Sequence, residues 1–367
     1  MHWGLSALET FRLCDTNITW LPDSICNWSK LQELYLFGST IKILPTSIGK
    51  LTSLIKLDLS WTYIRELPES IANLKALRYL VISHTPMNEL PESIGDFQDL
   101  EEFVLHDTKI SRLPESIGRL VKLNTLILNE TGITVLPDCI GQLTSLTRLW
   151  LSNLRIAKIP DSIGMLTALK ELRIQDVEIS YLPESIANLV HLEELGLTGT
   201  HISTLPEGIG NLAELKKPFI SEVKLTSLPE SIGRLTKLQT LWVKYTGITE
   251  LPESIGNLSN LESLDLRYAS ITELPESMGN LANLGYLVLD GSPLSTLPEC
   301  IRNLHALWSL SMSGTQIRKL PEFVAGMYPW QFLTLSPELF SDLPANIRKR
   351  NGLVISVWSE QDKPTIF

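Results

Sequence analysis

The sequence predicts an α/β repeat solenoid, which is a stack of similar coils rather than a globule around one central core. A proline recurs every 23 residues, fifteen times from Pro22 to Pro344, with no insertion or deletion between copies. The residue before this proline is Leu every time except at Ile159. A fixed period of this length is typical of stacked units that are each too small to bury their own apolar face.

The coil around Pro68 shows which elements each unit should contain. Leu57, Asp58 and Leu59 alternate apolar and polar side chains, which predicts a strand with one buried face. Pro68 has no amide hydrogen and suits the start of a helical turn, so residues 68–74 are predicted to form a short helix or 3₁₀ segment. Each coil should therefore run from a strand through a turn to a short helical segment on the opposite side.

This repeated pattern of Leu-x-x-Leu-x-Leu, then Ile, then Leu-Pro-x-Ser-Ile, resembles the leucine-rich repeat over essentially all of residues 5–344. It is similar in particular to repeats of plant intracellular immune receptors and of effectors from plant-pathogenic bacteria. The resemblance implies a leucine-rich-repeat horseshoe with a concave parallel β-sheet and with short helices or 3₁₀ turns on the convex side. It also implies a non-enzymatic scaffold that binds a protein partner, although the fold alone names no partner.

The two ends of the chain differ in their pattern. We expect the solenoid of about fifteen coils to occupy residues 1–344, and a C-terminal cap and tail to occupy residues 345–367, where the repeat gives way to a helical and then an apolar stretch. At the other end Leu5 already holds a repeat position. Either Trp3 and its neighbours form a minimal cap, or the chain is the C-terminal part of a longer protein, which we favour because an open end would expose core leucines.

The acidity of the chain has an explanation internal to the fold. The formal net charge is −10, and thirteen of the fifteen residues that follow the periodic proline are Asp or Glu. A carboxylate at the start of a helical turn meets unpaired amides there. Without these thirteen residues the net charge would be +3. The charge therefore indicates no cationic ligand, and no basic stripe of the kind that binds nucleic acid is present in the sequence.

The four cysteines, Cys14, Cys26, Cys139 and Cys300, stand far apart in the sequence and form no CxxC pair. Secreted repeat domains often close their ends with disulfides, so this pattern favours a reducing compartment. We therefore expect a cytoplasmic protein, or one delivered into a host cell. The sequence has no apolar run of about 18 residues that could span a membrane.

No known catalytic motif or phosphate-binding loop occurs in the sequence, and we predict no catalytic residue, no cofactor and no metal site. His84 and His106 lie near Asp107 on adjacent predicted coils, but a metal or acid–base site would need a third converging ligand. We interpret them as residues of a solvent-facing surface.

The outward-facing position in the middle of each predicted strand varies, whereas the buried positions repeat. These variable residues are Arg12, Tyr35, Asp58, Val81, Val104, Ile127, Trp150, Arg173, Gly196, Phe219, Trp242, Asp265, Val288, Ser311 and Thr334. Such variation on a uniform frame is what a recognition surface would show, and drift of solvated positions would produce it as well.

Exposed aromatic residues with interleaved cations favour recognition, because aromatic and arginine side chains dominate interface energetics. The predicted partner-binding residues are Trp150, Arg173, Phe219, Trp242, Lys244, Tyr245, Arg267, Tyr268, Tyr286 and Trp308. A smaller patch is predicted nearer the N-terminus, with an apolar strip beside it that acidic residues border. Its residues are Tyr35, Phe37, Trp61, Tyr79, the strip Val81, Val104 and Ile127, and the acidic Glu101, Glu102, Asp107 and Glu130.

Three functions fit this pattern. The first is a protein-binding scaffold, either a bacterial effector that acts in a host cell or a receptor repeat domain. The alternative is the substrate-recognition module of a larger enzyme, such as a ubiquitin ligase whose catalytic domain lies outside this chain. A third is a cell-surface adhesin, and the sequence upstream of Met1 would separate the three.

One coil breaks the repeat. Pro218 occupies a position where other coils carry Leu or Phe, inside a predicted strand of a parallel sheet. Proline lacks the amide hydrogen that such a strand donates, so residues 215–225 are predicted to form a weak seam.

Overall fold

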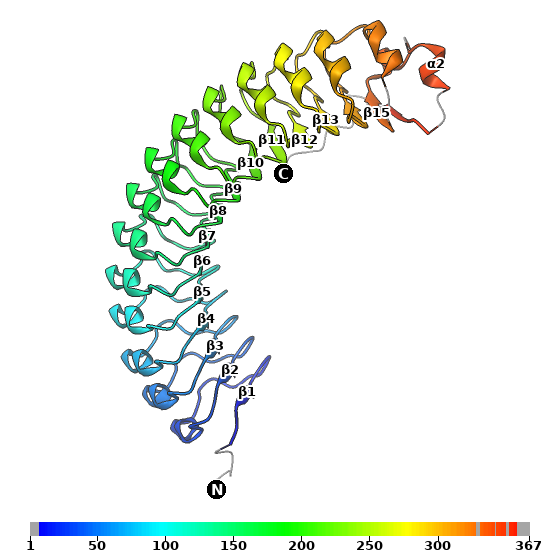
Figure 1. The fold of residues 1–367 in the computed structure, drawn as a ribbon. Coiled ribbons are helices and arrows are strands. Elements are labelled where there is room, and N and C mark those ends of the chain that lie inside the picture. Colours follow the sequence, from blue (N-terminus) through cyan, green and yellow to red (C-terminus); the bar gives the residue numbers. More distant parts are fainter. Residues whose placement is uncertain (1–6, 328–330, 342, 350–351, 358–367) are drawn as a thin grey trace. The chain divides into compact units, whose positions relative to one another are not determined.

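The structure is a computed structural model that describes residues 7–327, 331–341, 343–349 and 352–357. The chain divides into two compact units, residues 1–179 and residues 180–367, and each is described by itself. Within each unit, parallel strands line one side of the stack and 3₁₀ helices line the other (Figure 1). The predicted α/β repeat solenoid is therefore confirmed.

The first unit, unit 1, contains eight parallel strands in its described residues, and neighbouring strands of the unit pair in register with residues 23 positions apart. The strands are β1 Thr10–Arg12, β2 Glu33–Tyr35, β3 Lys56–Asp58, β4 Tyr79–Val81, β5 Glu102–Val104, β6 Thr125–Ile127, β7 Arg148–Trp150 and β8 Glu171–Arg173. Between them lie the 3₁₀ helices η1 Asp23–Asn27, η2 Thr46–Lys50, η3 Glu69–Asn73, η4 Glu92–Asp96, η5 Glu115–Arg119, η6 Asp138–Gln142 and η7 Asp161–Met165.

The second unit, unit 2, repeats this arrangement in its described part. Its strands are β9 Glu194–Gly196, β10 Lys217–Ser221, β11 Thr240–Lys244, β12 Ser263–Asp265, β13 Tyr286–Val288, β14 Ser309–Ser311, β15 Phe332–Leu335 and β16 Val354–Val357. Its helices are η8 Glu184–Asn188, η9 Glu207–Asn211, η10 Glu230–Arg234, η11 Glu253–Asn257, η12 Glu276–Asn280, η13 Glu299–Asn303, η14 Glu322–Gly326, α1 Pro337–Ser341 and α2 Ala345–Arg348. A helix and a strand thus follow Pro344. The division into a solenoid that ends at residue 344 and a cap and tail that begin at residue 345 stays a prediction.

The core of each unit is a stack of aliphatic layers. In the coil of β3, Leu54, Leu57 and Leu59 are fully buried, as are Ile64 and Ile71 farther round the same coil. Each buried leucine packs between the equivalent residues of its neighbours, which is why a single coil could not be stable alone. The strand lies one residue earlier than predicted, at Lys56–Asp58, because pairing with the next coil involves these three residues.

Three of the acidic residues after the periodic proline accept hydrogen bonds from backbone amides, and these amides belong to the following coil. Glu92 accepts from the amide of Ser116, and Glu230 and Glu253 accept from the amides of Ser254 and Ser277, all at 3.3 Å. Their own 3₁₀ helices have no side-chain cap. These carboxylates therefore connect neighbouring coils. Part of the chain's acidity thus has a structural role within the fold, as predicted.

In the turn that follows each of the strands β1 to β14, a single residue adopts the left-handed conformation, again with a period of 23. Gly38, Gly199, Gly291 and Gly314 suit this position, but Trp61 and other bulky residues also hold it, with φ near +55°. The next residue in many coils is Ser or Thr, and the hydroxyl of Thr62 donates to the carbonyl of Leu59 at 2.7 Å. The pattern of the sequence had not predicted this left-handed row, because most residues in it are not glycine.

The coil of Pro218 keeps its strand but changes its pairing. Pro218 is buried and pairs with Leu195 of β9, whereas the pairing of β10 with β11 begins only at Phe219. This pairing then extends through Ser221 and Lys244, beyond the strand ends of most coils. The pairing with β11 that is missing at Pro218 is thus replaced by additional pairing at the end of β10.

Candidate functional site

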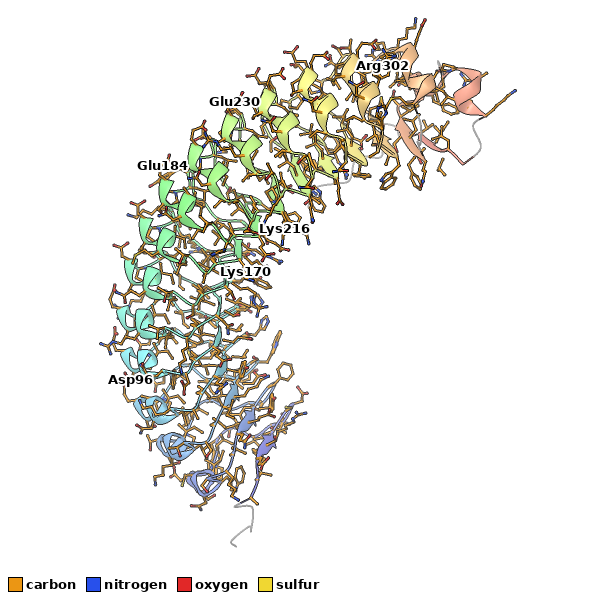
Figure 2. All side chains as sticks on the ribbon, in the orientation of Figure 1. Asp96, Lys170, Glu184, Lys216, Glu230 and Arg302 are labelled. Atoms are coloured by element: carbon orange, nitrogen blue, oxygen red, sulfur yellow. The ribbon has the colours of Figure 1, made fainter. Side chains whose placement is uncertain are left out.

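Side chains leave each unit on two sides. In Figure 2, Lys170 and Lys216 project from the strand side, and Asp96, Glu184, Glu230 and Arg302 project from the side of the 3₁₀ helices. On the strands the middle residue is buried and its neighbours point outward, as the burial of Glu33–Tyr35 shows. The outward residues of the strands and of the turns after them form the candidate interaction surface.

In unit 2, large aromatic side chains of neighbouring coils touch each other. Phe219 and Trp242 lie edge to face with ring centroids 4.9 Å apart. The ammonium group of Lys244 lies 5.4 Å from the centre of the Trp242 ring. The Trp242 side chain nevertheless remains 36% exposed, so the ring and its cation are available for a partner.

Two tyrosines in the left-handed row form a second contact. Tyr245 and Tyr268 stack with their ring centroids 4.9 Å apart and their planes only 16° from parallel. A side chain on Gly291 would collide with the Tyr268 ring, so this ring packs closely against the glycine of the next coil. Burial raises the pKa of Tyr245. These contacts hold both rings in place before any partner arrives.

A third aromatic group lies on β13 to β15. The rings of Tyr286 and Trp308 are 6.0 Å apart, and those of Trp308 and Phe332 are 5.9 Å apart. Phe332 was not among the predicted site residues, although it follows Tyr286 by two repeats and is 44% exposed. We call the eight residues of these groups, together with Arg267 next to Tyr268 in the sequence, the aromatic surface: Phe219, Trp242, Lys244, Tyr245, Arg267, Tyr268, Tyr286, Trp308 and Phe332.

Some residues of the predicted outward-facing row are not available. Gly196, Asp265, Val288 and Ser311 are buried, against the prediction. Asp265 accepts from the amide and the guanidinium of Arg267, at 3.1 and 3.3 Å. Ser311 donates to Asp290 at 2.6 Å. These polar residues bond to one another on the face instead of pointing into solvent.

The two remaining predicted residues, Trp150 and Arg173, lie in unit 1. The guanidinium of Arg173 lies 4.6 Å from the centre of the Trp150 ring. Glu171 binds both, accepting from the Trp150 indole at 3.0 Å and pairing with Arg173 at 2.6 Å. The ten predicted residues therefore form two sets, this pair in unit 1 and eight residues of the aromatic surface in unit 2.

The histidines of unit 1 do touch each other. Nδ1 of His84 lies 2.8 Å from an Asp107 carboxylate oxygen, and the His84 ring stacks on Trp61 with centroids 4.0 Å apart. His106 meets His84 edge-on at 4.7 Å. In the described part of the chain no group of three or more His, Cys, Asp or Glu residues could hold a metal ion.

The described residues also contain no helix that is long and apolar enough to cross a membrane.

Comparison with protein families agrees with this architecture. A model described as a leucine-rich repeat region matches residues 99–183 and 178–247, and a model described as a leucine rich repeat matches residues 259–317. The chain belongs to the leucine-rich repeat family. Its repeats form a protein–protein recognition scaffold, and repeats of this family are typically non-catalytic binding scaffolds.

Solved structures show which proteins the chain is similar to. A leucine-rich repeat protein of Leptospira interrogans is 27% identical with a TM-score of 0.79, over 96% of each chain. The plant peptide hormone receptor RGFR1, solved in complex with RGF2, is 28% identical with a TM-score of 0.67, over 90% of this chain and 60% of the receptor. An internalin of Listeria monocytogenes is 22% identical with a TM-score of 0.71, over 83% of this chain and 87% of the internalin, and shares the fold. No curated protein sequence matches the chain.

Proposed function

We propose that this protein is a non-enzymatic recognition scaffold that binds a protein partner through the aromatic surface of unit 2. The observation that carries the proposal is the contact between rings of successive coils, such as Phe219 on Trp242 and Tyr245 on Tyr268. Rings fixed by their neighbours lose little conformational freedom when a partner binds. Partly exposed, pre-ordered aromatic residues are typical of the residues that dominate binding energy.

The cations Lys216 and Lys217, which precede Phe219 in the sequence, and Arg267 of the aromatic surface favour binding of a protein rather than of a strongly charged ligand. Lys216 pairs with Glu193 at 2.7 Å, Lys217 pairs with Glu194 at 3.6 Å, and Arg267 pairs with Asp265. Because these cations are already paired with carboxylates, the aromatic rings supply most of the surface that a partner would cover.

A direct test replaces Phe219 and Trp242 together by Ala and measures affinity for a partner captured with this chain as bait. We expect the double variant to bind at least about 2 kcal/mol more weakly, since Phe219 and Trp242 contact each other and both aromatic side chains would be lost from the binding surface. Its circular dichroism should match that of the wild type, because neither side chain belongs to the buried core. Equal affinity of variant and wild type would move the binding surface elsewhere.

The similarity to RGFR1, a plant peptide hormone receptor solved in complex with RGF2, favours a receptor-type repeat domain with a polypeptide ligand. The resemblance to bacterial effector repeats favours action inside a host cell, where free cysteines are stable. The alternative is the recognition module of a larger enzyme such as a ubiquitin ligase. The sequence upstream of Met1 separates these roles, because a ligase would carry its catalytic domain outside this chain.

A further inference from the structure

Unit 1 carries a second outward-facing surface whose chemistry differs from that of the aromatic surface. Its centre is a strip formed by Val81, Val104 and Ile127, which follow one another in register on β4, β5 and β6. All three side chains point outward and are half-buried. Three aliphatic residues in a row form an apolar contact area without a polar interruption.

Carboxylates border this strip on the side where the strands begin. Glu101 pairs with Arg78 at 3.1 Å and accepts from the Tyr79 hydroxyl at 3.4 Å. Glu102 is half-buried, and no lysine or arginine among the described residues pairs with it. One of these two carboxylates is thus neutralised by the protein itself, and the other is not.

Carboxylates also border the strip on the side where the strands end. Asp107 and Glu130 are exposed and hold successive places in the left-handed row. Asp107 contacts His84, and in the described residues neither carboxylate pairs with a lysine or arginine. Trp61 lies in the same row, is 53% exposed and stacks on His84.

These carboxylates differ from the acidic residues beside the 3₁₀ helices. Glu92, Glu230 and Glu253 each accept from an amide of the next coil, which explains their presence. Among the described residues no backbone amide bonds to Glu102, Asp107 or Glu130, so coil packing does not account for them. Residues 101–107 hold three carboxylates and no lysine or arginine.

We propose that this acid-bordered strip binds a basic amphipathic segment of a protein partner. Aliphatic side chains of the segment would cover Val81, Val104 and Ile127, and lysine or arginine residues on its two sides would meet Glu102 and the pair Asp107 and Glu130. A further cation could lie on the exposed face of Trp61. The argument for this partner is charge complementarity on both sides of an apolar centre. The inference goes beyond the proposed function, because it assigns a separate surface.

The test uses two short synthetic peptides, one with two leucines flanked by lysines and one with glutamate in place of each lysine. Binding is measured by calorimetry at about 0.05 M and about 0.5 M salt, since screening weakens exposed charge pairs. We expect the lysine peptide to bind, more tightly at low salt, and the glutamate peptide not to bind. Failure of the lysine peptide to bind, or equal binding of both peptides, would overturn the proposal.

Matched variants locate the site. The triple variant Glu102→Gln, Asp107→Asn and Glu130→Gln should weaken the lysine peptide about tenfold, as expected for the loss of three charge pairs at the protein surface. The control variant Glu66→Gln, Glu89→Gln and Glu178→Gln changes the net charge equally, at exposed residues of unit 1 outside the strip, and should leave affinity unchanged. Equal losses in both variants would mean nonspecific attraction and would overturn the proposal.

A second pair of variants separates this surface from the aromatic surface. Val81→Thr with Val104→Thr keeps the side-chain shapes nearly unchanged and should weaken the lysine peptide at both salt concentrations, whereas unchanged affinity would contradict an apolar centre. The variant Phe219→Ala with Trp242→Ala should not change the affinity of the lysine peptide. Failure of the strip and failure of the aromatic surface are therefore distinguishable.

Discussion

At the scale of single residues, Cys14 differs in expected reactivity from the two buried cysteines Cys139 and Cys300. Burial raises the pKa of Cys139 and of Cys300 to about 11, whereas Cys14 is exposed. Because the thiolate is the reactive form, we expect Cys14 to react quickly with a thiol reagent near pH 8, and Cys139 and Cys300 to react only after unfolding. Mass spectrometry of the labelled chain identifies the sites. Rapid labelling of Cys139 in the folded protein would contradict its burial.

Asp290 should respond to pH in the direction opposite to an ordinary paired carboxylate. Burial raises its pKa, although Ser311 and the amide of Ser313 donate to it at 2.6 and 2.8 Å. A carboxyl group with a folded pKa above its unfolded value binds more protons when folded, so its contribution to stability rises as pH falls through the folded pKa. We therefore expect Asp290→Asn to stabilise the protein most at neutral pH and progressively less toward about pH 4.

The control for this prediction is Asp99→Asn. A hydrogen bond from Lys122, 2.5 Å away, lowers the pKa of the exposed Asp99. Its contribution to stability is present above the unfolded pKa and disappears as pH falls through the folded pKa, which is the opposite sign. Urea unfolding of both variants and the wild type across this pH range checks the two signs. Parallel pH curves for Asp290→Asn and the wild type would contradict the role of Asp290.

At the scale of the element, most of each coil could be predicted because the same local preferences recur in every copy. The alternation at Leu57–Leu59 predicts the strand within one residue, and Pro68 predicts the 3₁₀ helix Glu69–Asn73. The left-handed residue after each strand could not be predicted in this way, because Trp61 or Tyr245 there contradicts the usual preference for glycine or asparagine. The acceptor role of Glu92 toward the next coil depends on three-dimensional stacking and likewise leaves no local signal.

Pro218 makes β10 the element most open to a stability test. Leucine at this position would restore an amide hydrogen beside β11, whose pairing with β10 now begins one residue later. One regained hydrogen bond should stabilise the protein by about 1 kcal/mol. We expect Pro218→Leu to unfold at a higher urea concentration, and amides in residues 215–225 of the wild type to exchange faster than those in residues 123–133. Unchanged stability of the variant, or equal protection of both segments, would show that the longer pairing fully compensates.

At the scale of the whole molecule, the repeat explains why the fold was easier to predict than the site. Every coil contributes the same buried layer, so the period alone specifies the stack. The site depends on residues that vary from coil to coil, and their contacts, such as that of Arg173 with Trp150 of the preceding coil, appear only after stacking. Val288 shows that the position of a residue in the strand does not determine its exposure. Its position predicts an outward-facing side chain, but the structure buries it.

The stacking of coils also predicts how far the destabilising effect of a core substitution should extend along the chain. Leu126 is fully buried on β6, which pairs with β5 on one side and β7 on the other. Leu126→Ala should cost about 2 to 5 kcal/mol, because it removes transfer free energy and leaves a cavity between two coils. Since each coil contacts its neighbours, we expect faster hydrogen exchange in β5 and β7, and a smaller effect with each further coil. The control Val121→Ala changes a 49% exposed residue of the same unit and should leave exchange unchanged. A loss of protection that is uniform throughout unit 1 would instead show that its coils unfold as one cooperative block.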